Sequence, residues 1–199
     1  MKLSKINLKW VACFFALTLS ATVQSAYISG NQEYTLTGYD AFVDVYDTSI
    51  LNMTNYSRAA HINAYDQSTV NVYDAGDISF LNMHNASTAN IYSGNFSWVF
   101  LYDDSQANIY GLNTSWFLLG LNSHATIYGQ NLNYSNGHVS GMSLDGYYFG
   151  FDVLNIDAGG MILQGAPTNI TLSAVPLPAS LFLFISGLVF LFKYSHKKS

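Results

Sequence analysis

Paired carboxylates are the first residues in this chain that could do chemistry. Asp103 and Asp104 are adjacent, and Asp74 and Asp77 flank Gly76. Two carboxylates can cleave a glycosidic bond, and carboxylates also bind Ca²⁺. The histidines at positions 61, 84, 124 and 138 fall at repeat positions that other residue types also fill, which indicates structural substitutes rather than ligands. We therefore expect no catalytic residue, no metal and no cofactor, with a small polysaccharide-active enzyme as the alternative.

Aromatic residues stand at three fixed distances from a serine that recurs every 18 or 19 residues, at positions 49, 68, 87, 105 and 123. Seven residues before each serine come Phe42, His61, Phe80, Trp98 and Trp116; three before come Tyr46, Tyr65, His84, Tyr102 and Gly120; five after come Thr54, Tyr73, Tyr92, Tyr110 and Tyr128. Stacked rings could stabilise neighbouring repeats by about 0.5–1.5 kcal/mol per pair, or they could present a flat face to sugar rings.

For the sugar-binding alternative, the candidate glycan face consists of Phe42, Phe80, Trp98 and Trp116. A column of asparagines three residues after the serine would supply hydrogen bonds to sugar hydroxyls, or would bond to itself. These asparagines are Asn52, Asn71, Asn90 and Asn108.

Two alternating strands in each repeat would have to position these columns. The strand before each serine has the inward pairs Val43/Val45, Ile62/Ala64, Leu81/Met83, Val99/Leu101 and Phe117/Leu119. The strand after it has Leu51/Met53, Val70/Val72, Ala89/Ile91, Ala107/Ile109 and Ala125/Ile127. Asp-x-Ser suits the tight turn between the strands, because both side chains can bond backbone amides. Glycines 76, 94, 111 and 129 mark the return corner, where we expect positive φ.

These strands predict an all-β fold, a right-handed parallel β-helix of about five coils, rising ~4.8 Å per coil, over residues 40–130. Residues 26–39 would form an amino-terminal cap and residues 131–174 a carboxyl-terminal β cap. A left-handed hexapeptide helix is disfavoured because Ser57, Gly76, Asn95 and Asn113 occupy its third side. Meander hairpins of a sandwich remain an alternative.

Residues 1–25 have the pattern of a signal peptide for the Sec translocon. Three lysines at positions 2, 5 and 9 precede the apolar stretch from Trp10 to Leu19, and small residues follow. We expect cleavage between Ser25 and Ala26, which also removes Cys13.

Residues 175–199 have the pattern of a second targeting signal. Val175, Pro176, Leu177 and Pro178 lead into an uncharged run that ends at Phe192. A basic end follows with Lys193, Lys197 and Lys198. This order predicts a membrane-spanning helix with its basic flank in the cytoplasm. As a helix, residues 179–192 would span roughly 21 Å, less than the ~30 Å hydrocarbon core, which favours a transient anchor over a permanent one.

The proline pair, short apolar run and basic stop resemble the PEP-CTERM sorting signal in its Pro-Leu-Pro subtype. The typical signature has Glu where Leu177 stands. The resemblance covers about 25 of the 199 residues. It implies a Gram-negative bacterium with exopolysaccharide loci and an exosortase-like membrane transpeptidase as partner. It further implies export through the inner membrane, transient anchoring by the tail, and a final place on the outer surface or in the extracellular matrix.

Between the two signals the chain is strongly acidic. One arginine, Arg58, stands against all twelve acidic residues, so the net charge of this segment is −11 with histidine neutral. Such a surface repels nucleic acid. We expect a non-catalytic, structural or exopolysaccharide-associated surface protein that could self-associate. An ice- or surface-binding adhesin is a further alternative, although regular Thr-x-Thr ladders are absent from the sequence.

Overall fold

The computed structural model describes residues 24–175, and within this range the chain is all-β, without a helix. No membrane-spanning helix is therefore found among residues 24–175. The predicted apolar part of the signal peptide, the proline pair and the predicted membrane helix lie outside the described residues.

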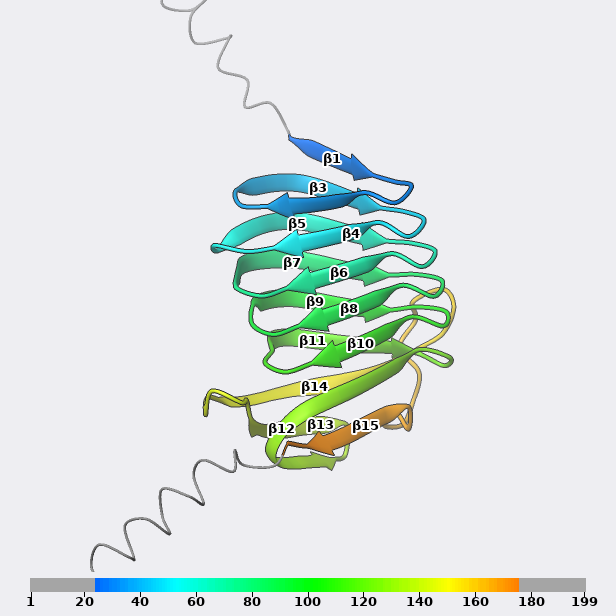
Figure 1. Ribbon diagram of the computed structural model, residues 1–199. Helices are drawn as coiled ribbons and strands as arrows, with labels where there is room; N and C mark the ends of the chain where they lie inside the picture. The colour runs from blue at the N-terminus through cyan, green and yellow to red at the C-terminus, as the bar shows by residue number, and fades with distance from the viewer. Residues whose placement is uncertain (1–23, 176–199) are drawn as a thin grey trace, which may run out of the picture.

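The strands form two facing parallel sheets that the chain visits in turn (Figure 1). The first sheet contains β1 (Ser25–Ile28), β3 (Tyr39–Val45), β5 (Ser57–Ala64), β7 (Ala75–Met83), β9 (Asn95–Leu101), β11 (Asn113–Gly120) and β14 (Tyr148–Ile156). The second contains β2 (Glu33–Leu36), β4 (Ile50–Met53), β6 (Thr69–Val72), β8 (Thr88–Ile91), β10 (Gln106–Ile109), β12 (His124–Ser135) and β15 (Ile170–Ala174). This is a β-solenoid of about six turns.

The pairing register confirms the repeat that the sequence predicted. Asn52 pairs with Asn71, Asn71 with Asn90, and Asn90 with Asn108, so equivalent residues of successive coils lie side by side. The segment expected as an amino-terminal cap forms β1 and β2, which pair in parallel with β3 and β4. It therefore continues both sheets as one more coil before residue 40.

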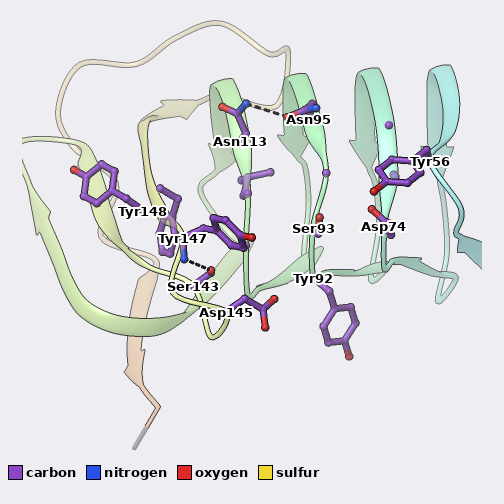
Figure 2. A pocket seen from close by; sticks show the side chains of 16 residues that line it. Tyr56, Asp74, Tyr92, Ser93, Asn95, Asn113, Ser143, Asp145, Tyr147 and Tyr148 are labelled. Atoms are coloured by element: carbon purple, nitrogen blue, oxygen red, sulfur yellow. Dashed lines mark hydrogen bonds between the residues drawn. The ribbon is translucent and has the colours of Figure 1, made fainter. Parts of the chain in front are cut away.

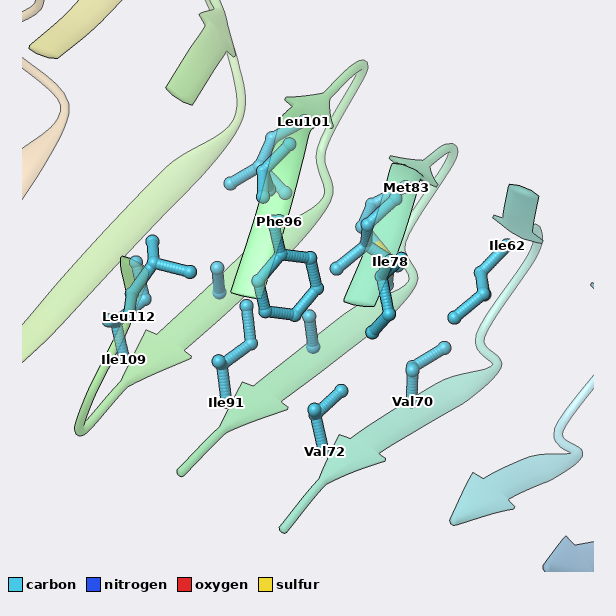
Figure 3. Packing of buried hydrophobic residues seen from close by; sticks show 14 of the residues in the cluster. Ile62, Val70, Val72, Ile78, Met83, Ile91, Phe96, Leu101, Ile109 and Leu112 are labelled. Carbon is cyan, nitrogen blue, oxygen red and sulfur yellow. The ribbon is translucent and has the colours of Figure 1, made fainter. Parts of the chain in front are cut away.

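The core fills the space between the two sheets. Every predicted inward side chain of the ten repeat strands is at most 1% exposed. Figure 3 shows Val70, Val72 and Ile91 of the second sheet facing Ile78 and Leu101 of the first. One coil alone cannot cover both of its apolar edges, so stacking is what closes this core.

The predicted tight turn is present, and it uses a left-handed backbone. Asp47, Asp66, Asn85 and Asp103 have φ between 53° and 60°. Asn and Asp tolerate this region better than other side chains with a Cβ. Gly30 has φ of 80° at the corresponding turn before β2, which explains how the first coil turns without the Asp-x-Ser pattern.

The expectation of positive φ at the return-corner glycines is wrong for Gly76, Gly111 and Gly129. Their glycine identity has a steric cause. A Cβ on Gly111 would lie 2.7 Å from the carbonyl oxygen of Tyr92, and one on Gly76 would lie 2.9 Å from that of Tyr56. The preceding coil comes so close at this corner that only backbone fits.

The carboxyl-terminal residues close the stack by folding back. β12 extends past the last repeat and forms an antiparallel hairpin with β13 (His138–Met142), which in turn pairs antiparallel with β14. β14 then pairs parallel with β11, and β15 pairs parallel with β12. The Asn169 side chain fastens the last coil by donating to the Gly120 carbonyl oxygen at 2.9 Å.

Candidate functional site

The predicted glycan face lies on the outer surface of the first sheet, on β3, β7, β9 and β11. Its rings belong to two stacked runs. In the first, His61 lies between Phe42 and Phe80, with ring centroids 5.1 and 4.6 Å apart and planes within 9°. In the second, Trp98 and Trp116 stack at 5.8 Å and 20°.

This stacking determines what the column offers to a ligand. The rings turn their faces to one another along the solenoid axis, so ring edges point outward. A sugar packs on a ring face, and faces are free only where a run ends. Phe42 and Trp116, each at the end of a run, are also the most exposed members at 43% and 37%.

The two tyrosine columns are continuous ladders, unlike the column that runs from Phe42 to Trp116. In one, neighbouring rings from Tyr46 to Tyr102 are stacked at 4.7–4.9 Å, and Tyr27 extends the column by one coil. In the other, rings from Tyr73 to Tyr128 stack at 4.6–5.1 Å. Within the first ladder, burial lowers the pKa of His84, partly opposed by the charge of Asp103, which favours a neutral imidazole between two phenol rings.

The asparagine column bonds to itself. The side-chain amide of Asn71 donates to Asn52 at 2.9 Å, Asn90 donates to Asn71 at 2.9 Å, and Asn108 donates to Asn90 at 2.9 Å. Asn52 in turn donates to Glu33 at 2.6 Å. These amides already satisfy one another, so the column stabilises the stack.

Three of the carboxylates singled out in the sequence have local contacts or positions in the solenoid. Asp103 belongs to the turn ladder, where it accepts a hydrogen bond from the backbone N–H of Asn85 at 2.9 Å. Asp77 lies 3.8 Å from Arg58, with both side chains mostly exposed. Asp74 lies at the return corner, beside Gly76. No group of three or more possible metal ligands occurs among residues 24–175.

The structure describes three of the predicted processing residues, and each lies in a strand or directly after one. Ser25 and Ala26, on either side of the expected signal-peptide cut, lie in β1 and pair with Phe42 and Val43. At the other end, the backbone N–H of Val175 donates to the Gly129 carbonyl oxygen at 3.0 Å. The remaining sorting residues, from Pro176 to Lys198, lie outside the described residues.

A groove that the sequence reasoning missed runs along the return corner, with a volume of about 340 Å³. Figure 2 shows Tyr56 and Asp74 on the side of the coils, and Tyr147 and Asp145 on the side of the cap. Its apolar lining includes Leu112. The sequence feature that could have indicated the groove is Tyr147-Tyr148 directly after Gly146, because two consecutive aromatic residues break the alternation of the strands.

The cap side of the groove is a tight turn held by Ser143. Its hydroxyl accepts a hydrogen bond from the Tyr147 N–H at 3.1 Å, and its own N–H donates to the Tyr147 carbonyl at 2.8 Å. Its carbonyl accepts from Gly146 at 3.0 Å, and Gly146 has the positive φ, 82°, that the turn requires. The turn therefore presents Asp145 and Tyr147 on a defined backbone.

Comparison with protein-family models, curated proteins and solved structures gives no match for this chain.

Proposed function

We propose that this protein is a non-catalytic scaffold displayed at the surface or in the extracellular matrix of a Gram-negative bacterium. It is exported by the Sec translocon, held briefly by its carboxyl-terminal helix, and processed at Pro176-Leu177-Pro178 by an exosortase-like transpeptidase. The resemblance of its tail to the PEP-CTERM signal supports the route.

The mutual bonding of the outward-facing columns is the observation that carries the structural part of the proposal. Three ring columns stack on themselves, and the asparagine column bonds to itself and to Glu33. An enzyme needs polar side chains that converge on a substrate, whereas these side chains are engaged along the axis. Such ladders stiffen a solenoid and suit a spacer or matrix element.

The place where the domain meets its tail also supports display. β15 ends at Ala174, and the last backbone hydrogen bond among residues 24–175 is the one from Val175 to Gly129, one residue before Pro176. The last coil is thus joined to the sorting signal without a spacer. We further infer a right-handed coil, because a strand, its crossover and the next parallel strand take that hand in about 98% of cases.

The test places one epitope within an exposed turn of the solenoid and a second after Ser199, in native host cells. We expect the surface product to keep the first epitope and lose the second. The double variant Pro176→Ala/Pro178→Ala should keep both epitopes together in the inner membrane. Ser180→Ala is the matched control and should be processed normally. If both epitopes remain together in the wild type, the tail is a permanent anchor and the sorting route is wrong.

A further inference from the structure

We propose that the corner groove binds a segment of a polysaccharide that carries no carboxylate, sulfate or phosphate groups. This inference deepens the proposed function, since it gives the scaffold a defined glycan site. The site differs from the ladder of Phe42, Phe80, Trp98 and Trp116, whose faces are mostly covered by their neighbours.

The groove has the two kinds of surface that a sugar ring needs. Two of its rim tyrosines are more exposed than any member of the column of Phe42, Phe80, Trp98 and Trp116: Tyr56 is 72% and Tyr147 76% exposed, against 43% for Phe42. A third rim tyrosine, Tyr92, is 42% exposed. No stacked aromatic partner covers Tyr56 or Tyr147 among the described residues. Their faces are therefore available to the apolar C–H face of a pyranose.

Polar groups beside these rings can bind the hydroxyls at the edge of the same sugar. Asp74 and Asp145 provide carboxylate acceptors on opposite sides of the groove (Figure 2). Asn113 donates to Asn95 at 3.0 Å, which leaves the Asn95 amide hydrogens without a side-chain partner in the described part of the chain. A volume of about 340 Å³ lies at the lower end of the ~300–1,000 Å³ typical of ligand sites, and suits a short segment of a chain.

The backbone that lines the groove has one residue in a rarely adopted conformation and one position where only glycine fits. Tyr56 has φ of 56°, a conformation that is uncommon for a bulky side chain, and its N–H donates to the Asp74 carbonyl at 2.7 Å. This costly conformation holds the ring out at the corner, and such strain clusters at ligand sites. At Gly111 the floor must be bare backbone, because a Cβ there would meet the Tyr92 carbonyl at 2.7 Å.

Charge selects among glycans. Among the described residues, no lysine, arginine or histidine lines the groove, two aspartates do, and the segment between the two signals carries −11 overall. Uronate, sulfate or phosphate groups would therefore meet the like charge of Asp74 and Asp145, and Arg58, which lies beside Gly76 at the same corner, is already 3.8 Å from Asp77. Neutral pyranoses and sugars with free amino groups meet no such repulsion.

The test is isothermal titration of the full chain in detergent micelles with three pentasaccharides: β-1,4-glucose, fully deacetylated β-1,4-glucosamine, and α-1,4-galacturonate. We expect one or both of the first two to bind, and galacturonate to bind at least about tenfold more weakly. The glucose and glucosamine arms distinguish neutral from amine-bearing ligands, and binding that weakens with salt identifies the latter.

Variants locate the binding. Tyr147→Ala should weaken binding at least about threefold by removing one stacking face. Tyr39→Ala removes an exposed tyrosine of β3 that does not line the groove, and it should bind like the wild type. Circular dichroism confirms that both variants are folded.

The proposal is overturned if galacturonate binds as tightly as the other two, if Tyr147→Ala has no effect, or if neither glucose nor glucosamine pentamer binds at millimolar concentration. These outcomes leave the epitope experiment untouched, because sorting does not depend on the groove. Conversely, a permanently anchored tail would leave glycan binding intact, so the two failures are distinguishable.

Discussion

The turn ladder at Asp66 allows a quantitative prediction, because two separate effects act on one residue. Asp66 has φ of 60°. Its carboxylate accepts a hydrogen bond from the backbone N–H of Asp47 at 3.2 Å, and its own N–H donates to the Asn85 side chain at 3.1 Å. Substitution can remove the tolerance of positive φ, the hydrogen bond to Asp47, or both.

Three variants separate these effects. Asp66→Asn retains both, as Asn85 does naturally in the same column, and it should change the free energy of unfolding by less than about 0.5 kcal/mol. Asp66→Gly keeps the backbone conformation and loses the acceptor, at a cost of about 0.5–1.5 kcal/mol. Asp66→Ala loses the acceptor and also strains the backbone, which adds about 1 kcal/mol and gives roughly 2 kcal/mol in total.

The assay is thermal and urea unfolding followed by far-ultraviolet circular dichroism. A loss of about 2 kcal/mol in a domain of this size lowers the melting temperature by roughly 4–8 °C. We expect stability in the order Asn, then Gly, then Ala. If Ala is as stable as Asn, neither the left-handed turn nor the inter-coil bond matters, and the reasoning about this turn is wrong.

Three further predictions concern the ladders and the core. Asn71→Ala removes two side-chain hydrogen bonds and should cost about 1–3 kcal/mol in urea unfolding, whereas Thr69→Ala on the same strand should cost less than about 0.5 kcal/mol; equal losses would contradict the amide ladder. Burial lowers the pKa of His84, so as pH falls below 6.5 the unfolded chain binds the proton before the folded chain does, and the free energy of unfolding should decrease. The decrease should be smaller in His84→Tyr, and equal pH dependence of the melting temperature in the two proteins would refute this. Asp40 is buried without a hydrogen-bond partner among residues 24–175, and burial raises its pKa, so its ionisation opposes folding as pH rises above the unfolded value of 3.8. Asp40→Val should therefore be more stable than the wild type at pH 7, with a gain that decreases in acid. A gain independent of pH would contradict the assignment.

Periodicity alone identified the coil, its two strands and its inward residues. Each coil returns to the same place after 18 or 19 residues, so a spacing in the sequence becomes a contact in space. For that reason the spacing alone places Tyr65 against Tyr46 and His84, and Asn71 against Asn52, and the fold confirms both contacts.

The spacing did not predict the orientation of the side chains within these columns. The same aromatic column serves as a sugar platform or as a stabilising stack, depending on whether ring faces point outward or along the axis. Planes within 9° along Phe42, His61 and Phe80 show that these rings stack along the axis, while sugar binding by this column stays a prediction. Spacing also placed positive φ at the return glycines, but Gly76, Gly111 and Gly129 lack it, whereas Asp66 and its equivalents have it. A single repeat cannot reveal the turn ladder, which supplies hydrogen bonds from the next coil.

The sequence by itself determined which residues repeat, which of them face inward, and that two segments with the pattern of targeting signals flank an acidic domain. Only the tertiary structure decided the groove, because its walls come from return corners of different coils and from one turn of the cap. Asp145 and Tyr147 reach that corner through the antiparallel hairpin of β12 and β13, which brings the chain back against the stack. A contact that occurs once, between a repeat and a segment that does not repeat, leaves no periodic trace in the sequence.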